Sequence, residues 1–416
     1  MPRHGMTPVR TRALAALLPL LIIAVPTTSG AAPDTSDLIG GPSVVAEPLL
    51  EQNAPEVGMS AGLLSTSDGR SLWERRADDE RAMASITKIM TALVVLERAE
   101  LDEMVTVSAE AAAVGESEAG LKAGQQVSVR SLLEALLVHS ANDAAMALAE
   151  HVAGDVPAFV ALMNEKAASL GLRDTAFKNP HGLDERGHYT SARDLATLAR
   201  VAMDDPFFAE TAAAPAIRFP RAGGGTTRFE NTNPLIGSYE GATGVKTGWT
   251  DAAGYCLVAS AERNGTELTA VVLGTPSVEA RRRDAEALLN WGFDHCRPLE
   301  LASADETAAL VAVSDYVDVT VPAVVAESTS AVLFDLDGPV VRHTDVRATV
   351  EAPVKAGQRL GTVSFVQNGR LIAQVPVVAA KSVAAPEPAD SVRIWLTRLW
   401  RAVSGEPLQA TPVPVM

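Results

Sequence analysis

Cysteine and positive charge are both scarce in this sequence, and each shortage excludes a class of protein. Only two cysteines, Cys256 and Cys296, occur in 416 residues, and a chain of this length needs no disulfide to hold its core. An oxidising compartment would permit a bond between them, but we expect two free thiols. The formal net charge is −16, and we see no contiguous basic patch in the main body. Binding to nucleic acid is therefore not expected, because phosphate contacts require a basic face.

The N-terminal apolar run is too short to cross a bilayer. The stretch "ALAALLPLLIIAV" spans about 13 residues and includes Pro19, whereas a membrane-spanning helix needs roughly 20 apolar residues. Arg3, Arg10 and Arg12 precede this run, and the small residues "TTSGAA" follow it. A positive start, a short apolar segment and a small-residue cleavage zone are typical of a secretory signal peptide. We therefore predict a signal peptide over residues 1–31 and an exported protein.

The main body has the pattern of an α+β domain. Residues 32–54 are rich in Pro, Gly and small polar residues and are interpreted as a leader segment. Residues 55–296 begin with a hairpin pattern that turns at Asp68-Gly69, continue with amphipathic helical segments, and return to a hairpin pattern at Asn264-Gly265 followed by a helix. This order predicts a mostly antiparallel sheet with a separate cluster of helices.

The C-terminal third has a different composition. Residues 297–381 contain short Val- and Thr-rich runs separated by turns, which predicts a small C-terminal β domain of the sandwich type. Residues 382–391 form a Pro- and Ala-rich linker. The tail, residues 405–416, has no predicted role. Together with the length of the chain, these changes indicate two domains.

An amphipathic helix is predicted over residues 392–404. Its apolar stripe at helical spacing comprises Val392, Trp395, Leu396, Leu399, Trp400 and Val403. Arg393, Arg398 and Arg401 lie off the stripe, and such a helix is typical of membrane interfaces. Each arginine near an anionic leaflet would contribute about 1 kcal/mol. The alternative is a helix docked on its own protein, but the preceding linker favours the membrane.

The stretch "ASITKIM" places a lysine among apolar residues. Ser85 and Lys88 are three residues apart, so their side chains share one face of a helix. A lysine surrounded by apolar neighbours has a lowered pKa, which makes a neutral amine available. A neutral amine beside a hydroxyl can act as a general base beside a nucleophile. A lysine that extends to solvent is the alternative, and the pair alone does not decide between them.

Two further motifs follow in a particular order. "HSANDAA" contains Ser140 and Asn142 at the start of an apolar helix, and "TGVKTGWT" contains Lys246, Thr247 and Gly248 before a strand. The order Ser-x-x-Lys, Ser-x-Asn, Lys-Thr-Gly resembles that of penicillin-binding proteins and serine β-lactamases. The resemblance implies their fold, an antiparallel sheet with a helical cluster.

The resemblance implies a role for each motif residue. Ser85 is the nucleophile that forms an acyl ester, Lys88 accepts its proton, and Ser140 relays a proton to the leaving amine. The expected substrate-binding residues are Asn142, Lys246, Thr247, Gly248 and Trp249, with the backbone N–H groups of Ser85 and Trp249 forming an oxyanion hole. Gly248 would allow the substrate backbone to approach the edge strand.

Within this superfamily the chain most resembles the low-molecular-mass D-alanyl-D-alanine carboxypeptidases. The similarity rests on "ASITKIMTAL", "SANDAAMALAE", "FKNPHGLD" and "GVKTGWTDAAGYCLVASA". It implies removal of the terminal D-alanine from peptidoglycan pentapeptide stems, acylation by β-lactams, and no metal or cofactor. It also implies a location at the outer face of the bacterial cytoplasmic membrane, with the C-terminal helix as anchor.

One position departs from the family pattern. Some relatives carry an arginine between the two asparagines of "NTN" that helps to bind the substrate carboxylate, and Thr232 stands there in this chain. Arg228 is one candidate replacement. Three alternatives stay open: a β-lactamase, although no "E-x-x-x-N" follows the second motif; a DD-endopeptidase; and a non-catalytic penicillin-binding sensor. His139, His181 and His188 lack the spacing of metal ligands, and His139 is expected to be structural.

Overall fold

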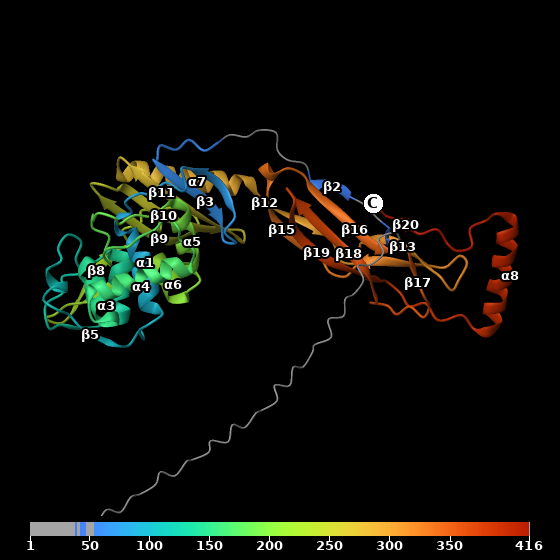
Figure 1. The fold of residues 1–416 in the computed structure, drawn as a ribbon, viewed down its shortest axis with the longest axis horizontal. Coiled ribbons are helices and arrows are strands. Elements are labelled where there is room, and N and C mark those ends of the chain that lie inside the picture. The colour runs from blue at the N-terminus through green and yellow to red at the C-terminus, as the bar shows by residue number, and fades with distance from the viewer. Residues whose placement is uncertain (1–37, 40–41, 47–53, 416) are drawn as a thin grey trace, which may run out of the picture.

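The computed structural model describes residues 38–39, 42–46 and 54–415, and the predicted signal peptide lies outside them. Figure 1 shows a catalytic-motif domain at one end, a β domain beside it, and helix α8 (Pro388–Ser404) at the far end. Within the described residues no single helix is long and apolar enough to cross a bilayer; only α3 (Asn142–Ala153) and α4 (Val156–Ser169) together reach that length and composition, with a bend of 86° between them.

The first domain is built on a five-stranded antiparallel sheet. Its strands lie in the order β4 (Ser71–Arg75), β3 (Ala61–Thr66), β11 (Thr266–Thr275), β10 (Gly254–Arg263) and β9 (Ala242–Thr250). The turn between β10 and β11 consists of Asn264 and Gly265, both with positive φ, as a tight hairpin turn requires. The predicted hairpins at this turn and at Asp68-Gly69 are both confirmed.

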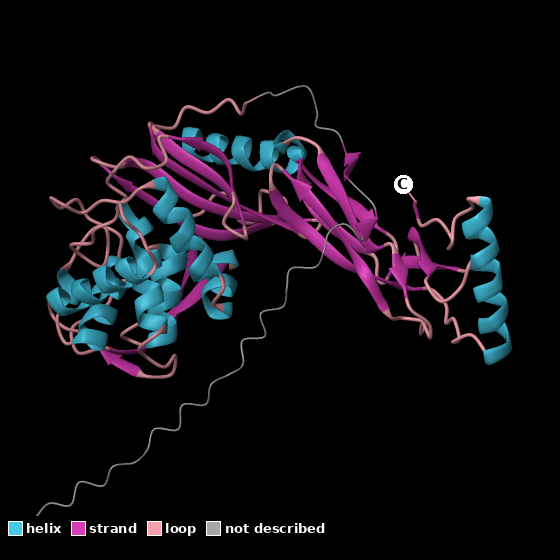
Figure 2. Ribbon diagram, turned by 45° about the vertical axis from the view of Figure 1, so that its right-hand side comes forward, coloured by secondary structure: helices cyan, strands magenta, loops and turns pink. Residues whose placement is uncertain are grey.

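Helices cover both faces of this sheet. Alternate residues of a strand point to opposite faces, so Leu63 packs with the helical cluster while Leu64 packs under α7 (Val278–His295). The helical cluster contains α3, α4 and the remaining helices α1 (Lys88–Leu96), α2 (Val129–Glu134), α5 (Ala192–Met203) and α6 (Pro206–Ala213). Figure 2 shows this separation of helices and strands, which confirms the predicted α+β class.

Two short strand pairs border the helical cluster. One consists of β5 (Met104–Thr106) and β6 (Gln126–Ser128), the other of β7 (Ala216–Pro220) and β8 (Thr226–Glu230).

The second domain is made almost entirely of strands around its own apolar core. A two-stranded sheet, β12 (Cys296–Ala302) with β15 (Thr329–Phe334), faces a nine-stranded sheet. The larger sheet contains β13 (Thr307–Val313), β14 (Thr320–Val325), β16 (Val340–Arg347), β17 (Thr349–Val350), β18 (Arg359–Gln367) and β19 (Arg370–Ala379). Both cysteines are buried and free, as predicted.

Three short strands of the larger sheet come from segments that the sequence analysis left unstructured. In the leader segment, β1 (Leu38–Ile39) and β2 (Pro42–Ala46) pair with β16, about 300 residues away in sequence. In the tail, β20 (Val413–Pro414) pairs with β13. The helix α8 begins at Pro388, inside the predicted linker. Its flanking segments are therefore both attached to the β domain, since Val383 also bridges to Val354.

Candidate active site

The first motif lies at the start of α1. A 3₁₀ turn, Ala84–Thr87, leads into the helix at Lys88, and Lys88 is completely buried. Its Nζ lies 2.8 Å from Ser85 Oγ, 2.7 Å from Asn142 Oδ1 and 2.6 Å from the carbonyl oxygen of His181. The structure thus brings the predicted nucleophile, base and amide together, as the i, i+3 spacing requires.

The hydrogen-bond partners of Lys88 determine where its lone pair points. Asn142 Nδ2 donates to the carbonyl of Gly115 at 3.0 Å, so Oδ1 is the atom that faces Lys88, and it can only accept. The carbonyl of His181 also can only accept. A neutral amine has two N–H groups, and these two acceptors take both. Its lone pair is then left for the hydroxyl proton of Ser85.

Burial lowers the pKa of both motif lysines. Burial, and next the charge of Lys246, hold the pKa of Lys88 well below its usual 10.5, against the opposing effect of Glu116 and Asp143. Burial and the nearby Arg281 lower the pKa of Lys246 to about 7. At neutral pH the site can therefore contain a free base and a cation side by side.

The second motif depends on an unusual backbone. A π-helical turn, Ala135–His139, ends at Ser140, which has left-handed φ and ψ of 65° and 31°. This conformation costs a non-glycine residue on the order of 1 kcal/mol or more. It places Ser140 in the wall of the same pocket as Ser85. A strained residue maintained at this point is consistent with the predicted function of Ser140.

The third motif lies on the edge strand β9. Lys246 is buried and donates to the carbonyl of Thr247 at 3.1 Å, while Thr247 Oγ1 donates to Thr232 Oγ1 at 2.9 Å. A Cβ added to Gly248 would lie 3.0 Å from both the backbone nitrogen of Ser85 and the carbonyl oxygen of Met83. The glycine is therefore also needed for close packing of β9 against the nucleophile turn, a reason that the sequence did not suggest.

These motifs surround one pocket of about 390 Å³. Its lining comprises Ser85, Glu116, Ser117, Ser140, Asn142, Leu183, Thr247, Gly248, Trp249, Thr250 and Arg281. Six of the eight predicted site residues line it; the exceptions are Lys88 and Lys246, which are both buried behind the pocket surface. Trp249 is half exposed, at 50%, with its ring 5.8 Å from that of Tyr255.

Arg281 is a pocket residue that sequence reasoning missed. It lies in the first turns of α7, is 6% exposed, and donates to the carbonyls of Gly248 and Cys256 at 3.4 and 3.3 Å. The stretch "EARRRD" looks like a solvated charge run. However, position 281 continues the buried stripe of Ala285, Leu288 and Leu289 at helical spacing, and an arginine at such a position was the available signal.

The suggested role of Arg228 is wrong. This arginine is exposed on β8, pairs with Glu230 at 2.7 Å and does not line the pocket. Because it lies outside the pocket lining, it does not take the place of the arginine that some relatives carry near Thr232. Arg281, on a different element, is the guanidinium that the fold brings to this pocket.

His139, His181 and His188 have structural surroundings. His139 stacks on Phe229, with ring centroids 3.9 Å apart. Burial lowers the pKa of His181 to about 3 and that of His188 to about 4. Nδ1 of His188 accepts from the backbone of Lys178, so its Nε2 carries the proton toward Thr87. Among the described residues no group of three or more His, Cys, Asp or Glu side chains is arranged to hold a metal ion.

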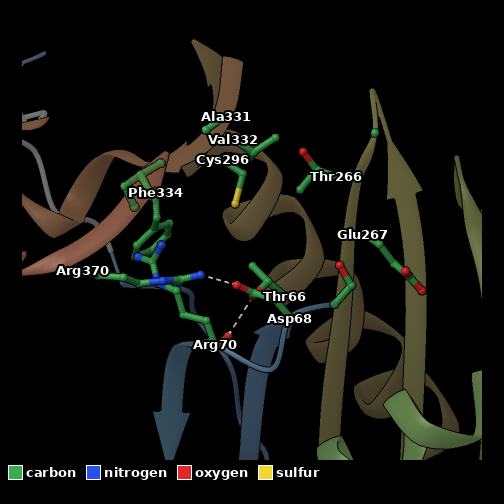
Figure 3. A pocket seen from close by; sticks show the side chains of 13 residues that line it. Thr66, Asp68, Arg70, Thr266, Glu267, Cys296, Ala331, Val332, Phe334 and Arg370 are labelled. Atoms are coloured by element: carbon green, nitrogen blue, oxygen red, sulfur yellow. Dashed lines mark hydrogen bonds and ion pairs between the residues drawn. The ribbon is translucent and has the colours of Figure 1, made fainter. Parts of the chain in front are cut away.

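A second cavity, of about 210 Å³, lies between the two domains (Figure 3). Arg370 of β19 pairs there with Asp68 of the β3–β4 turn, and Arg70 lies 5.3 Å from the ring centroid of Phe334. The Cys296 thiol also lines it, and burial raises the pKa of that thiol to about 11. The ion pair between Arg370 and Asp68 joins the two domains, and none of the three motifs lines this cavity, so it is not the catalytic pocket.

Comparisons with known proteins agree with this geometry. A family model for D-alanyl-D-alanine carboxypeptidases matches residues 51–277, and one for the C-terminal domain of penicillin-binding protein 5 matches residues 298–385. The carboxypeptidase DacF of Bacillus subtilis is 32% identical over 78% of this chain and 85% of its own length. The carboxypeptidase DacC of Escherichia coli is 36% identical over 79% of this chain and 85% of its own length.

Solved structures show the same relationship. The D-alanyl-D-alanine carboxypeptidase DacD of Francisella tularensis superimposes with a TM-score of 0.60 at 27% identity, over 82% of this chain and 97% of its own. The Streptomyces K15 DD-transpeptidase gives 0.56 at 35% identity, over 58% of this chain and 100% of its own. With three motifs around one pocket and a family match over more than half of its length, the chain belongs to the D-alanyl-D-alanine carboxypeptidase family of serine peptidases.

Proposed function

We propose that this enzyme works through an acyl ester on Ser85 and is held at a membrane surface by α8. The protein is a serine-type D-alanyl-D-alanine carboxypeptidase, a cell-wall enzyme that acts on peptidoglycan stem peptides and binds β-lactams. The observation that carries the mechanism is the contact set of Lys88, whose two carbonyl acceptors leave its lone pair for the Ser85 hydroxyl.

In the acylation step Ser85 Oγ attacks the carbonyl carbon of the penultimate D-alanine. Lys88 takes the hydroxyl proton as the new C–O bond forms. The C–N bond to the terminal D-alanine then breaks, and its amine receives the proton of Lys88 through the Ser140 hydroxyl, which returns Lys88 to its neutral form. Ser140 is suited to this relay because it is in the pocket wall beside Ser85 and is nine-tenths buried.

In the deacylation step a water molecule adds to the acyl ester. Lys88 removes a proton from this water, the ester C–O bond breaks, and Ser85 Oγ regains its proton. The shortened peptide leaves with a new carboxylate. No step consumes a metal or cofactor.

The oxyanion that forms in each step needs two backbone donors. We assign the N–H groups of Ser85 and Trp249 to it. The close approach of Gly248 to the Ser85 nitrogen supports this assignment, because the amide of the next residue in β9 is then near that of Ser85.

The terminal carboxylate of the substrate needs a cationic partner. Thr247 offers a hydroxyl, Lys246 a positive charge and Arg281 a guanidinium at the same side of the pocket. We propose that Arg281 supplies the charge that the missing "NTN" arginine supplies in some relatives. Its Nε has no hydrogen-bond partner among the described residues, and a buried unpaired donor favours an incoming anion.

Release of D-alanine tests the mechanism. The mature enzyme should free D-alanine from a peptide ending in D-Ala-D-Ala, and Ser85→Ala should abolish release and the covalent adduct with benzylpenicillin, seen by mass spectrometry. Release that persists in the variant would exclude Ser85 as the nucleophile. Adduct formation without D-alanine release in the parent enzyme would instead favour the endopeptidase or the silent penicillin-binding protein, and rapid turnover of penicillin would favour the β-lactamase.

The anchoring part of the proposal rests on α8. Its six stripe residues are 53–80% exposed, with Trp395 and Trp400 among them, and tryptophan favours the membrane interface. In Figures 1 and 2 the helix lies at the end of the β domain farthest from the active-site domain. A membrane there would leave the catalytic pocket clear of the lipid.

The expected role of the α8 arginines needs correction. Arg398 donates to the backbone carbonyls of Ser314 and Tyr316, and Arg401 pairs with Asp318 at 2.8 Å. These two arginines therefore hold the helix on the β domain instead of facing lipid headgroups. The same contacts turn the apolar stripe outward. Membrane anchoring by the stripe is therefore better supported than anchoring by the arginines.

A flotation experiment tests the anchor. The full mature chain should float with vesicles containing anionic lipid, and a chain ending at Glu387 should remain in the soluble fraction. D-alanine release by both chains controls for folding. Equal flotation by the two would exclude α8 as the anchor.

A further inference from the structure

The loop of residues 115–121 is built directly onto the second motif. Asn142 donates from its side chain to the Gly115 carbonyl at 3.0 Å and from its backbone to the Ser117 carbonyl at 2.7 Å. The buried carboxylate of Asp143 accepts from the backbone N–H groups of Ala119 and Leu121 at 2.9 and 3.0 Å. The loop is therefore fixed relative to Lys88, because the same Asn142 side chain contacts both.

Glu116 lies at the most strained point of this loop. Its φ is 63°, in the left-handed region, and it follows Gly115 at 83°. A glutamate disfavours this conformation, which glycine and asparagine tolerate. Its side chain nevertheless lines the catalytic pocket. Within the part of the chain that the structure describes, no lysine, arginine or histidine forms an ion pair with it. An exposed, unpaired carboxylate at a fixed place in a binding pocket is available to a ligand.

The charges around the pocket are separated. Arg281 acts electrostatically on Lys246, and these two cations belong to the side formed by β9 and α7. Glu116 acts on Lys88 from the side formed by the loop. A substrate whose carboxylate lies at the cationic side would place a preceding residue toward the anionic side. A positive charge on that residue would match Glu116.

We propose that Glu116 selects peptides that carry a primary ammonium group on the long side chain of the residue preceding D-Ala-D-Ala, a diamino acid with its second amine free. The proposal rests on the carboxypeptidase mechanism above and adds a specificity determinant to it. Glu116 takes no part in bond breaking. It acts as an ionic partner at the pocket entrance, where contact with solvent limits its strength.

Two peptides that differ only in one charge test this proposal. Acetyl-Lys-D-Ala-D-Ala with a free side-chain amine is compared with the same peptide acetylated on that amine, and kcat/KM for D-alanine release is measured for each. We expect the parent enzyme to prefer the charged peptide by about fivefold at low salt, as for an exposed ion pair, and the preference to shrink as salt is added.

Three variants separate charge from backbone geometry. Glu116→Gln removes the charge, Glu116→Asn removes it in a residue that accepts the left-handed backbone, and both should bring the ratio of the two kcat/KM values close to one. Glu116→Lys should invert the preference. Glu110→Gln is the matched control, because Glu110 is exposed nearby, outside the pocket, and it should keep the parent ratio.

The urea unfolding midpoint of each variant, compared with that of the parent enzyme, verifies the fold. Acylation by benzylpenicillin, which lacks the ammonium group, is measured in each variant to normalise the rates for the effect of Glu116 on Lys88. The same two peptides are also measured as competitors of this acylation, so that selectivity is read even if no D-alanine is released. No preference in the parent enzyme, or full preference in Glu116→Gln, would overturn the proposal. Loss of D-alanine release with selective competition would instead overturn the mechanism and leave Glu116 as a binding determinant.

Discussion

The catalytic pocket and the C-terminal helix depart from ordinary protein architecture in opposite ways. The pocket buries three basic side chains, Lys88, Lys246 and Arg281, each at most 6% exposed. The helix α8 exposes Trp395 and Trp400 at 62% and 70%, with four aliphatic residues beside them. Buried charges and exposed apolar patches are both unusual in stable domains.

Each departure has a free-energy cost that folding alone does not repay. Burying an unpaired ion costs several kcal/mol, and leaving an aromatic or aliphatic side chain in water forgoes about 1.5–3 kcal/mol of burial. The costs differ in what removes them. In the pocket, the cost is removed when a lysine loses its proton or when an anion binds. On the helix, the cost is removed when the apolar stripe enters a membrane. The two regions should therefore respond to different substitutions and different conditions.

The largest expected effect is at Lys88. Lys88→Ala should lower the rate of acylation by benzylpenicillin about a thousandfold, because general-base catalysis typically contributes 10² to 10⁴. The rate is measured by stopped flow, with benzylpenicillin competing against a chromogenic cephalosporin. Lys355→Ala, at an exposed lysine of the β domain, should acylate at the parent rate. Rapid acylation of Lys88→Ala would mean that burial of this lysine serves the core and not the reaction.

Substitutions in α8 should lower membrane affinity and leave catalysis unchanged. The double variant Trp395→Ser, Trp400→Ser retains β20 and the arginine contacts, unlike a truncation. We expect its affinity for anionic vesicles to fall by about a hundredfold, as the loss of two buried aromatic side chains predicts. D-alanine release and the urea midpoint should be unchanged, since both side chains are exposed. Unchanged vesicle affinity together with a lower midpoint would show that the stripe packs on the protein itself.

The pocket should also respond to pH. With the pKa of Lys246 near 7, kcat/KM should fall by about tenfold between pH 7 and pH 9 as the cation that attracts the substrate carboxylate is lost. Lys246→Arg keeps its charge across this range and should shift the decline to higher pH. A decline at the same pH in both enzymes would assign it to another group. Vesicle binding by α8 should not follow this profile.

The free energy of unfolding should rise between pH 7 and pH 9, where kcat/KM is expected to fall. The pKa of Lys246 is 10.5 in its usual state and about 7 in the folded protein. Between these values the unfolded chain binds more protons, so its contribution to the free energy of unfolding rises with pH. Below about pH 7 both states hold the proton and the burial cost is fully present. Urea unfolding at pH 6.5 and 9, with Lys246→Met as reference, measures the difference.

Sequence reasoning succeeded where neighbours in sequence are neighbours in space. The i, i+3 spacing of Ser85 and Lys88 determines their contact, and the order of the three motifs identified the residues that meet around it. The hairpin turn at Asn264-Gly265 was equally predictable, because two residues of positive φ determine it. In each case local geometry carried the information.

It failed where the partner is distant or where a charge is on an apolar stripe. The strands β1 and β2 were missed because their pairing partner, β16, lies about 300 residues away. In the sequence Arg281 looked like one of three solvated arginines, but it lies on the buried face of α7. The arginines of α8 had the expected spacing, but only the fold shows that they contact Ser314, Tyr316 and Asp318.

The smallest expected effect compares the same substitution in the pocket and on the surface. In Gly248→Ala the new methyl group would lie 3.0 Å from the Ser85 nitrogen, so the nucleophile turn must move by a few tenths of an ångström. Because catalysis depends steeply on such geometry, we expect about a threefold slower acylation. Gly223→Ala places its methyl group where no atom lies within 4 Å and should acylate at the parent rate. Equal rates in the two variants would show that the contact between β9 and the nucleophile turn adjusts freely, and that the role of Gly248 is to admit the substrate backbone.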